Sequence, residues 1–244
     1  MLHLRDNYPR YTCGLRGSAE VLAEFREVCK GGYLDSARFL SQRYGLTADD
    51  ARADNNSALR WACANGHLDV AQWLYATFNL TEPRIEYVFH LTCEYGHLNV
   101  AQWLCTIAKD DFPPCVTGAA FQVGCAHGHL DVTKWLFSEF NLAPDDVRVN
   151  DNRSLQWTCA NGHLEVITWL CSTFDLTADD ARAADNRALR LACQNGHLDV
   201  AQWLVRTFNL TADDARADNN YALRWACQNG HFDVSQWLRT TFEI

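Results

Sequence analysis

The sequence predicts an all-α fold, a solenoid of stacked helix-turn-helix repeats, on three observations. The phrase CANGHLDVAQWL, from Cys63 to Leu74, recurs five more times with small changes. Apolar residues within each unit follow helical spacing. The histidine of the Gly-His pair recurs at nearly constant spacing, at His67, His97, His129, His163, His197 and His231. Units of this length stack into solenoids, because each one buries its apolar face against its neighbours.

Each unit is expected to hold two helices with a glycine between them. In one unit, Asn and Ser before residue 58 supply N-cap residues for a first helix that ends at Gly66. Leu68, Trp73 and Phe78 then follow the spacing of a second helix. The connector contains Thr47-Ala-Asp-Asp50, a capping-box pattern, so we expect a short third helical segment that ends at Asp54-Asn55-Asn56.

Seven such units are expected to form one array over residues 18–244, after an N-terminal extension over residues 1–17. The most divergent unit, CKGGYLDSARFL, places Tyr33 one repeat period before His67. The first and last units are expected to act as caps. The last carries Arg239 and Ser235 where internal units carry mostly apolar residues, which suits an exposed terminal face.

Composition narrows the classes of partner. The net charge of −9 disfavours nucleic acid, whose phosphates need clustered Lys and Arg. No apolar run is long enough to cross a membrane, and the first residues lack the apolar core of a signal peptide. Seven of the eleven cysteines recur once per unit in register, which favours small buried side chains in a reducing compartment. We therefore expect a cytoplasmic monomer with no membrane partner.

The string LRWACANGHLDV, Leu59 to Val70, resembles the ankyrin-repeat pattern of an apolar first helix, two variable residues, Gly-His-Leu, an acid and valine. The match recurs in six units and more weakly in the first. A tetratricopeptide array has the same repeat length, but its tryptophan-glycine-tyrosine spacing is absent here. The resemblance implies an ankyrin-like solenoid. The sequence departs from the family in two respects. The threonine-proline pair before the first helix is absent, and short helical segments are expected where the family has β-hairpin fingers.

Repeated Cys and His residues raise the alternative of a metal-binding array. Cys63 and His67 are close in sequence, but Gly66 should end the helix between them, and each unit would offer two ligands where structural zinc needs four. A packed thiol and a histidine that bridges backbone at the junction are favoured. We therefore predict no metal and no cofactor. The tryptophans that recur before leucine in the second helix are interpreted as core residues.

Two sets of arginines recur at fixed positions of the repeat. Arg60, Arg190 and Arg224 share one repeat position, where the resemblance implies a bond to a neighbouring unit's backbone; an acid-binding stripe is the alternative. The arginines that follow paired Asp residues are expected to form ion pairs with those Asp side chains at the solvated edge. No phosphate loop, nucleophile elbow or zinc-protease motif is present, so we predict no enzymatic activity.

Two variable positions per unit remain as candidates for recognition. One lies just before the first helix, and the other lies immediately before Gly-His, where the resemblance implies a concave binding face. The predicted partner-binding residues are Tyr87, Glu94, Tyr95, His127, Arg153, Asn161, Arg187, Asn195, Tyr221 and Asn229. We expect a scaffold that binds a partner protein here, most strongly around Tyr87, Glu94, Tyr95, His127 and Arg153. The alternative is an adaptor or effector that delivers a partner to an enzyme encoded elsewhere.

Overall fold

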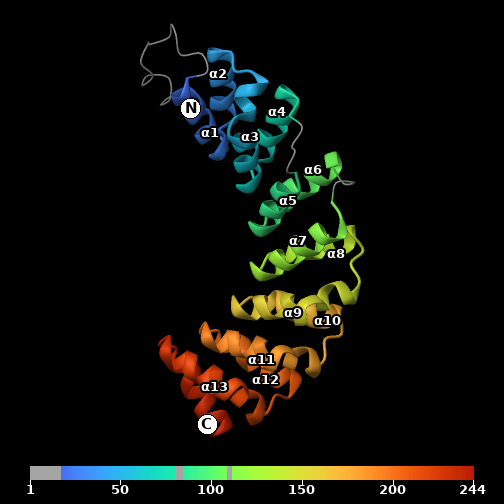
Figure 1. Ribbon diagram of the computed structural model, residues 1–244, viewed down its shortest axis with the longest axis vertical. Coiled ribbons are helices and arrows are strands. Elements are labelled where there is room, and N and C mark those ends of the chain that lie inside the picture. The colour runs from blue at the N-terminus through green and yellow to red at the C-terminus, as the bar shows by residue number, and fades with distance from the viewer. Residues whose placement is uncertain (1–17, 81–84, 109–111) are drawn as a thin grey trace. The chain divides into compact units, whose positions relative to one another are not determined.

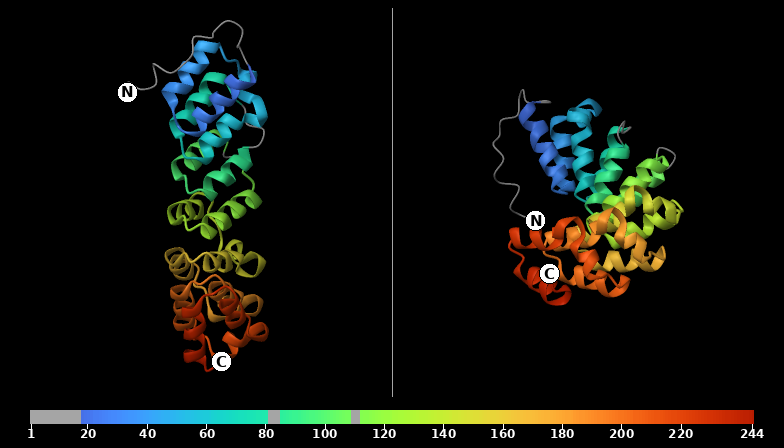
Figure 2. Two further views of the ribbon diagram at one scale, coloured as in Figure 1. Left: turned by 90° about the vertical axis from the view of Figure 1, so that its left-hand side faces the viewer. Right: turned by 60° about the horizontal axis from the view of Figure 1, so that its bottom comes forward.

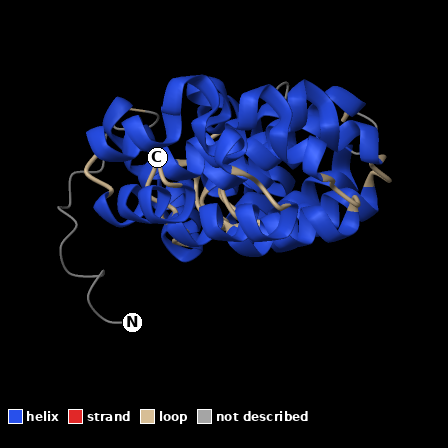
Figure 3. Ribbon diagram, turned by 90° about the horizontal axis from the view of Figure 1, so that it is seen from below, coloured by secondary structure: helices blue, strands red, loops and turns tan. Residues whose placement is uncertain are grey.

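The computed structural model describes residues 18–80, 85–108 and 112–244, and it confirms the all-α prediction. The described residues form fourteen helices and no strand (Figure 3). Contacts divide the chain into two compact units, Met1–Arg84 and Ile85–Ile244, and each is described by itself. The N-terminal extension and parts of the two short connectors lie outside the described residues. The single array of residues 18–244 stays a prediction.

Each repeat contributes a first and a second helix, as the spacing predicts (Figure 1). The first unit contains α1 (Ala19–Lys30), α2 (Leu34–Tyr44), α3 (Ala48–Ala64) and α4 (Leu68–Phe78). The second unit contains α5 (Ile85–Glu94), α6 (Leu98–Ala108), α7 (Pro114–Ala126), α8 (Leu130–Glu139), α9 (Pro144–Ala160), α10 (Leu164–Thr173), α11 (Ala178–Gln194), α12 (Leu198–Phe208), α13 (Ala212–Gln228) and α14 (Phe232–Phe242).

The helices form two layers within each unit. In the second unit the first helices α5, α7, α9, α11 and α13 pack on one another in chain order, and each also packs against the second helix of its own repeat (Figures 1 and 2). In the first unit, α1 packs on α3 in the same way. The first helices thus form one continuous layer per unit, on which side chains of successive repeats line up.

The core lies between these two layers. Cys29, Cys63 and four further cysteines at the same position are fully buried, as the prediction of small packed thiols requires. The repeated tryptophans instead remain half-buried. Five of the six pack the ring on a phenylalanine in the following turn, as Trp73 does edge-on against Phe78 with 5.7 Å between centroids, whereas the residue at that position after Trp103 is Ala108. The tryptophans are therefore packing residues, but the fully buried core consists of Leu, Val, Ala and Cys side chains together with Phe25, Phe89, Phe121 and Ile167.

The predicted third helical segment is present and joins the first helix through left-handed backbone. In α3, the capping box of Thr47 and Asp50 starts a short right-handed turn. Three consecutive residues, Asp54 to Asn56, then adopt left-handed conformations with φ of 53°, 57° and 56°. Asn and Asp tolerate this region better than other residues with a side chain. The same arrangement recurs in α9, α11 and α13.

The shared arginine position corrects one expectation from the sequence. Arg190 donates to the carbonyl of Ala184, in the left-handed turn of its own repeat, at 3.0 Å. Arg60 and Arg224 do the same to Asp54 and Asp218. Within the described part of the chain, these arginines therefore close a turn earlier in their own repeat, with no bond to a neighbouring repeat's backbone. Arg190 also binds an acid, as the alternative expected, because it pairs with Asp218 of the next repeat.

The last repeat brings a second correction. Ser235 was expected on an exposed terminal face, but it is 4% exposed and donates to the carbonyl of Phe232.

The junction between repeats is built from the Gly-His pair and the residue two before the histidine. The last carbonyl of a helix has no intrahelical partner. Asn161 donates to the final carbonyl of α7, that of Ala126, at 2.6 Å. Asn195 and Asn229 repeat this bond one and two repeats later. The histidine ring lies beside the preceding repeat's glycine, and His129 Nε2 is 2.9 Å from the carbonyl of Glu94.

Gly162→Ala should destabilise the protein more than Gly230→Ala. Both glycines have left-handed backbone, with φ of +79° and +80°, so both variants carry the same conformational strain. A Cβ at residue 162 would also overlap the His197 ring, whereas nothing lies within 4 Å of a Cβ at residue 230. We expect an extra loss of about 1–3 kcal/mol for Gly162→Ala, measured by urea unfolding. Equal losses would contradict the proposed junction.

Ala184→Asn should stabilise the protein. Ala184 is the only alanine among the described left-handed turn residues, with φ of 52°, and Asn150 stands at the same position one repeat earlier. Asparagine relieves part of the cost of left-handed backbone, so we expect a gain of about 0.5–1 kcal/mol in the free energy of unfolding. The control is Ala183→Asn, where the backbone is extended with φ of −51°. An equal gain there would point to a cause other than the turn.

Candidate partner-binding surface

Three parallel rows of side chains cross the first helices of the second unit. Within one helix the rows are about one turn, or roughly 6 Å, apart along the axis, so they lie on successive turns of one face. The N-terminal row is Tyr87, Ala119, Arg153, Arg187 and Tyr221. The middle row is Leu91, Val123, Trp157, Leu191 and Trp225. The C-terminal row is Tyr95, His127, Asn161, Asn195 and Asn229. Nine of the ten predicted residues thus fall in the two outer rows.

The N-terminal row combines accessible and internally bonded side chains. Tyr87 is 50% exposed, and Arg153 and Arg187 are exposed with no ion pair to another described residue. Tyr221 differs, because its hydroxyl donates to Gln194 Oε1 at 2.6 Å. The guanidinium of Arg190 also lies over the Tyr221 ring, 4.8 Å from its centroid. Tyr221 is therefore held within the protein, while the other three can contact a partner.

The middle row is the part of the surface that the variable positions did not reveal. Trp157 is 47% exposed, an unusual exposure for a tryptophan, and it lies between Arg153 and Asn161 on α9. Together with Arg153 and Arg187 it lines a shallow hollow of about 190 Å³. The sequence contains the signal for this position, because Trp157 lies one turn after Arg153 and one turn before Asn161, both of which are predicted partner-binding residues.

The C-terminal row divides into residues that hold the junction and residues that do not. Asn161, Asn195 and Asn229 are exposed, but each uses its amide on the preceding repeat's carbonyl. Tyr95 and His127 stand in the same row without that bond. Tyr95 is 50% exposed, and His127 Nδ1 is 2.9 Å from the carbonyl of Val123 in its own helix.

The tenth predicted residue, Glu94, precedes Tyr95 at the end of α5. Its side chain is 28% exposed, and a carboxylate oxygen lies 3.9 Å from His90 Nδ1. Glu94 therefore borders the rows, and its backbone carbonyl belongs to the junction with His129.

Next to these rows, burial shifts the pKa of the junction histidine His163 and of the buried thiol of Cys193. Burial, followed by the nearby His127, His129 and His197, lowers the pKa of His163, so its ring is neutral at neutral pH. Burial raises the pKa of the Cys193 thiol to about 12, so this thiol is protonated and a poor nucleophile. Within the described ranges, no group of three or more His, Cys, Asp or Glu side chains could hold a metal ion.

Arginine–aspartate pairs connect the repeats along the connector edge, the edge formed by the short helical turns. These arginines were expected to answer the Asp pair that precedes them, and Arg52 does so with Asp49 at 3.5 Å. Arg182 instead reaches the next repeat and donates from Nε and Nη2 to both oxygens of Asp214, at 2.9 and 3.1 Å. Arg148 likewise reaches the next repeat and donates from Nε to Asp180 at 3.1 Å.

Two family models match the chain. The model described as ankyrin repeats (3 copies) matches residues 121–214 and 155–243. The model described as ankyrin repeats (many copies) matches residues 26–74. A comparison with curated proteins found no match. No helix in the described part of the chain has the length and apolar character needed to span a membrane.

Stability should fall in acid as Asp214 is protonated. Burial alone would raise the pKa of Asp214, but the bonds from Arg182 and Thr211 outweigh it and lower that pKa to about 2. An unfolded Asp has a pKa of about 3.9. Because the folded value is lower, the stabilisation is present above about pH 4 and is lost as the pH falls towards 2. Urea unfolding at pH 5, 4 and 3 should show this loss in the wild type and a smaller one in Asp214→Asn. Identical slopes would contradict it.

Proposed function

Because the chain belongs to the ankyrin-repeat family, whose repeats are generally protein–protein interaction modules, we propose that it is a non-enzymatic scaffold that binds a partner protein. The proposed contact surface is the three-row face of α5, α7, α9, α11 and α13. This face corresponds to the concave face expected from the resemblance. The family is typically non-enzymatic, which agrees with the absence of catalytic motifs from the sequence.

The observation that carries this proposal is the loss of the junction asparagine in two repeats, those whose first helices are α5 and α7. In the later repeats this position holds Asn, whose amide bonds to the preceding repeat. Tyr95 and His127 replace it and leave large side chains at the surface. A tyrosine half exposed to water offers a partner a wide apolar ring and a polar hydroxyl.

The composition of the face supports the same conclusion. An apolar middle row that includes Trp157 runs between an N-terminal row with Tyr and Arg and a C-terminal row of polar residues. Protein interfaces commonly place apolar contacts at the centre and polar ones at the rim, and Trp, Tyr and Arg dominate their binding energy. Arg153 and Arg187 are available to pair with acidic groups of the partner.

We also propose that the protein acts as a monomer in the cytoplasm and does not bind nucleic acid. The described cysteines at the repeated position are free thiols, six of them buried, which agrees with a reducing compartment. The net charge of −9 opposes binding to phosphate backbones.

Affinity capture from cell lysate tests the proposed surface. The variant Tyr95→Ala/His127→Ala/Arg153→Ala removes one large side chain from each of three successive repeats. We expect it to lose at least one protein that the wild type retains, because truncating an interface anchor costs about 2 kcal/mol or more. Mass spectrometry would identify that protein, and titration calorimetry with the purified partner would measure the loss.

The matched control changes exposed residues on the second helices of the same three repeats, Gln102→Ala/Lys134→Ala/Thr168→Ala. Both variants should keep the free energy of unfolding of the wild type to within about 0.5 kcal/mol per substitution, because all six residues lie at the surface. If the three-row variant captures the same proteins as this control, the proposed surface is wrong.

A further inference from the structure

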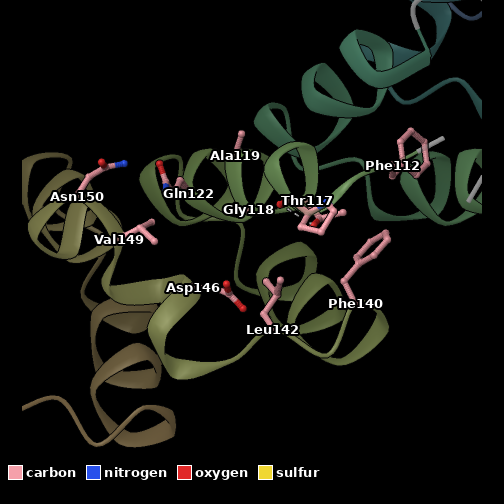
Figure 4. A pocket seen from close by; sticks show the side chains of 11 residues that line it. Phe112, Thr117, Gly118, Ala119, Gln122, Phe140, Leu142, Asp146, Val149 and Asn150 are labelled. Carbon is pink, nitrogen blue, oxygen red and sulfur yellow. Dashed lines mark hydrogen bonds between the residues drawn. The ribbon is translucent and has the colours of Figure 1, made fainter. Parts of the chain in front are cut away.

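A cavity of about 820 Å³ opens in the second unit between α7, the end of α8 and the start of α9 (Figure 4). Figure 4 shows Asp146 and Leu142 side by side, facing the α7 wall that carries Thr117 and Gly118. Phe112, Phe140 and Val149 add apolar surface. This volume is within the range of about 300–1,000 Å³ that is typical of ligand sites.

Asp146 occupies a position that binds an arginine in the next two repeats. The equivalent residue is Asp180 one repeat later and Asp214 two repeats later, at equal spacing. Asp180 accepts from Arg148 Nε at 3.1 Å and from Asn152 Nδ2 at 3.0 Å, both in the preceding repeat. Asp214 accepts both bonds from Arg182 of the preceding repeat. An arginine donor is therefore the regular partner of this carboxylate.

The fourth repeat lacks both donors. Pro114 and Gly118 stand one repeat before Arg148 and Asn152, and both line the cavity. Proline and glycine carry no donor side chain. Asp146 keeps the capping bond from the backbone N–H of Ala143 to Oδ2, at 2.8 Å, and pairs with no cation among the described residues. One repeat later, the side chains of Arg148 and Asn152 occupy the equivalent positions. The cavity lies where Pro114 and Gly118 stand in their place.

We propose that this cavity binds an arginine side chain of a partner protein. The guanidinium would donate to Asp146 as Arg182 does to Asp214, and the side-chain oxygens of Gln122 and Asn150 on the lining can accept its other N–H groups. Phe112, Phe140 and Leu142 add apolar surface to the lining, against which the arginine stem can pack. The net charge of −9 attracts a basic segment.

This inference rests on the proposed function only in assigning the arginine to a partner protein. The cavity adjoins the three-row face, because Ala119 of the N-terminal row is on its lining, but it includes none of the residues changed in the three-row variant. The two experiments therefore change different residues.

Titration of the isotope-labelled full chain with N-acetyl-arginine methylamide tests the site by amide chemical shifts. We expect saturable shifts at Gly118, Leu142 and Asp146. The uncharged citrulline analogue, which cannot form the ion pair, should cause none. Asp146→Asn should weaken binding about tenfold or more, because a hydrogen bond between charged groups is lost. Asp145→Asn, the matched control at an exposed carboxylate outside the cavity, should bind as the wild type does.

A second variant fills the site from within. Pro114→Arg/Gly118→Asn restores the two donors of the later repeats, and it should abolish probe binding while Asp146 remains. The proposal is overturned if the probe causes no saturable shifts, if Asp146→Asn binds as tightly as Asp145→Asn, or if citrulline binds equally well. None of these results would bear on the three-row surface, which is tested by capture.

Discussion

The arrangement of the repeats depends on one constraint, which is that the carboxyl end of each first helix must find hydrogen-bond donors. Helix ends leave carbonyl groups without intrahelical partners, and burying them unpaired costs free energy. Here the next repeat supplies the donors, Asn161 to Ala126 and His129 to Glu94. The glycine beside the histidine makes room for its ring. Each repeat therefore satisfies the helix end of the repeat before it, and each repeat is stabilised by its nearest neighbours.

The connector edge provides a second link between neighbours, with its own chemistry. Arg182 and Arg148 bind the capping-box aspartates of the next repeat. The carboxylate that caps a short helical turn therefore also forms an ion pair with an arginine of the preceding repeat. Partly buried pairs of this kind, above all the bidentate one at Asp214, contribute more than isolated surface pairs, and they depend on pH. Arginine–aspartate pairs thus link successive repeats along this edge, and the series is interrupted where Pro114 and Gly118 stand in place of the donors Arg148 and Asn152.

Both candidate surfaces arise from departures around the third and fourth repeats. Replacing the junction asparagine places Tyr95 and His127 at the surface, and replacing the edge donors leaves Asp146 beside a cavity without its regular arginine partner. In the first case new side chains become available to another molecule, and in the second a carboxylate does. A partner that supplies the missing contacts would stabilise this part of the chain by mass action, because it binds the folded state.

The sequence by itself determined the elements whose causes are local. Helical spacing, the glycine between helices and the Thr47–Asp50 capping box each act within a few residues, so the helices and the third helical segment were predictable. It also located the variable positions. Only the tertiary structure decided what those side chains do, because their partners lie about one repeat away. The amide of Asn161, the reach of Arg182, the exposure of Trp157 and the cavity beside Asp146 all depend on the register in which helices stack. That register is a property of packing between repeats, which no local pattern specifies.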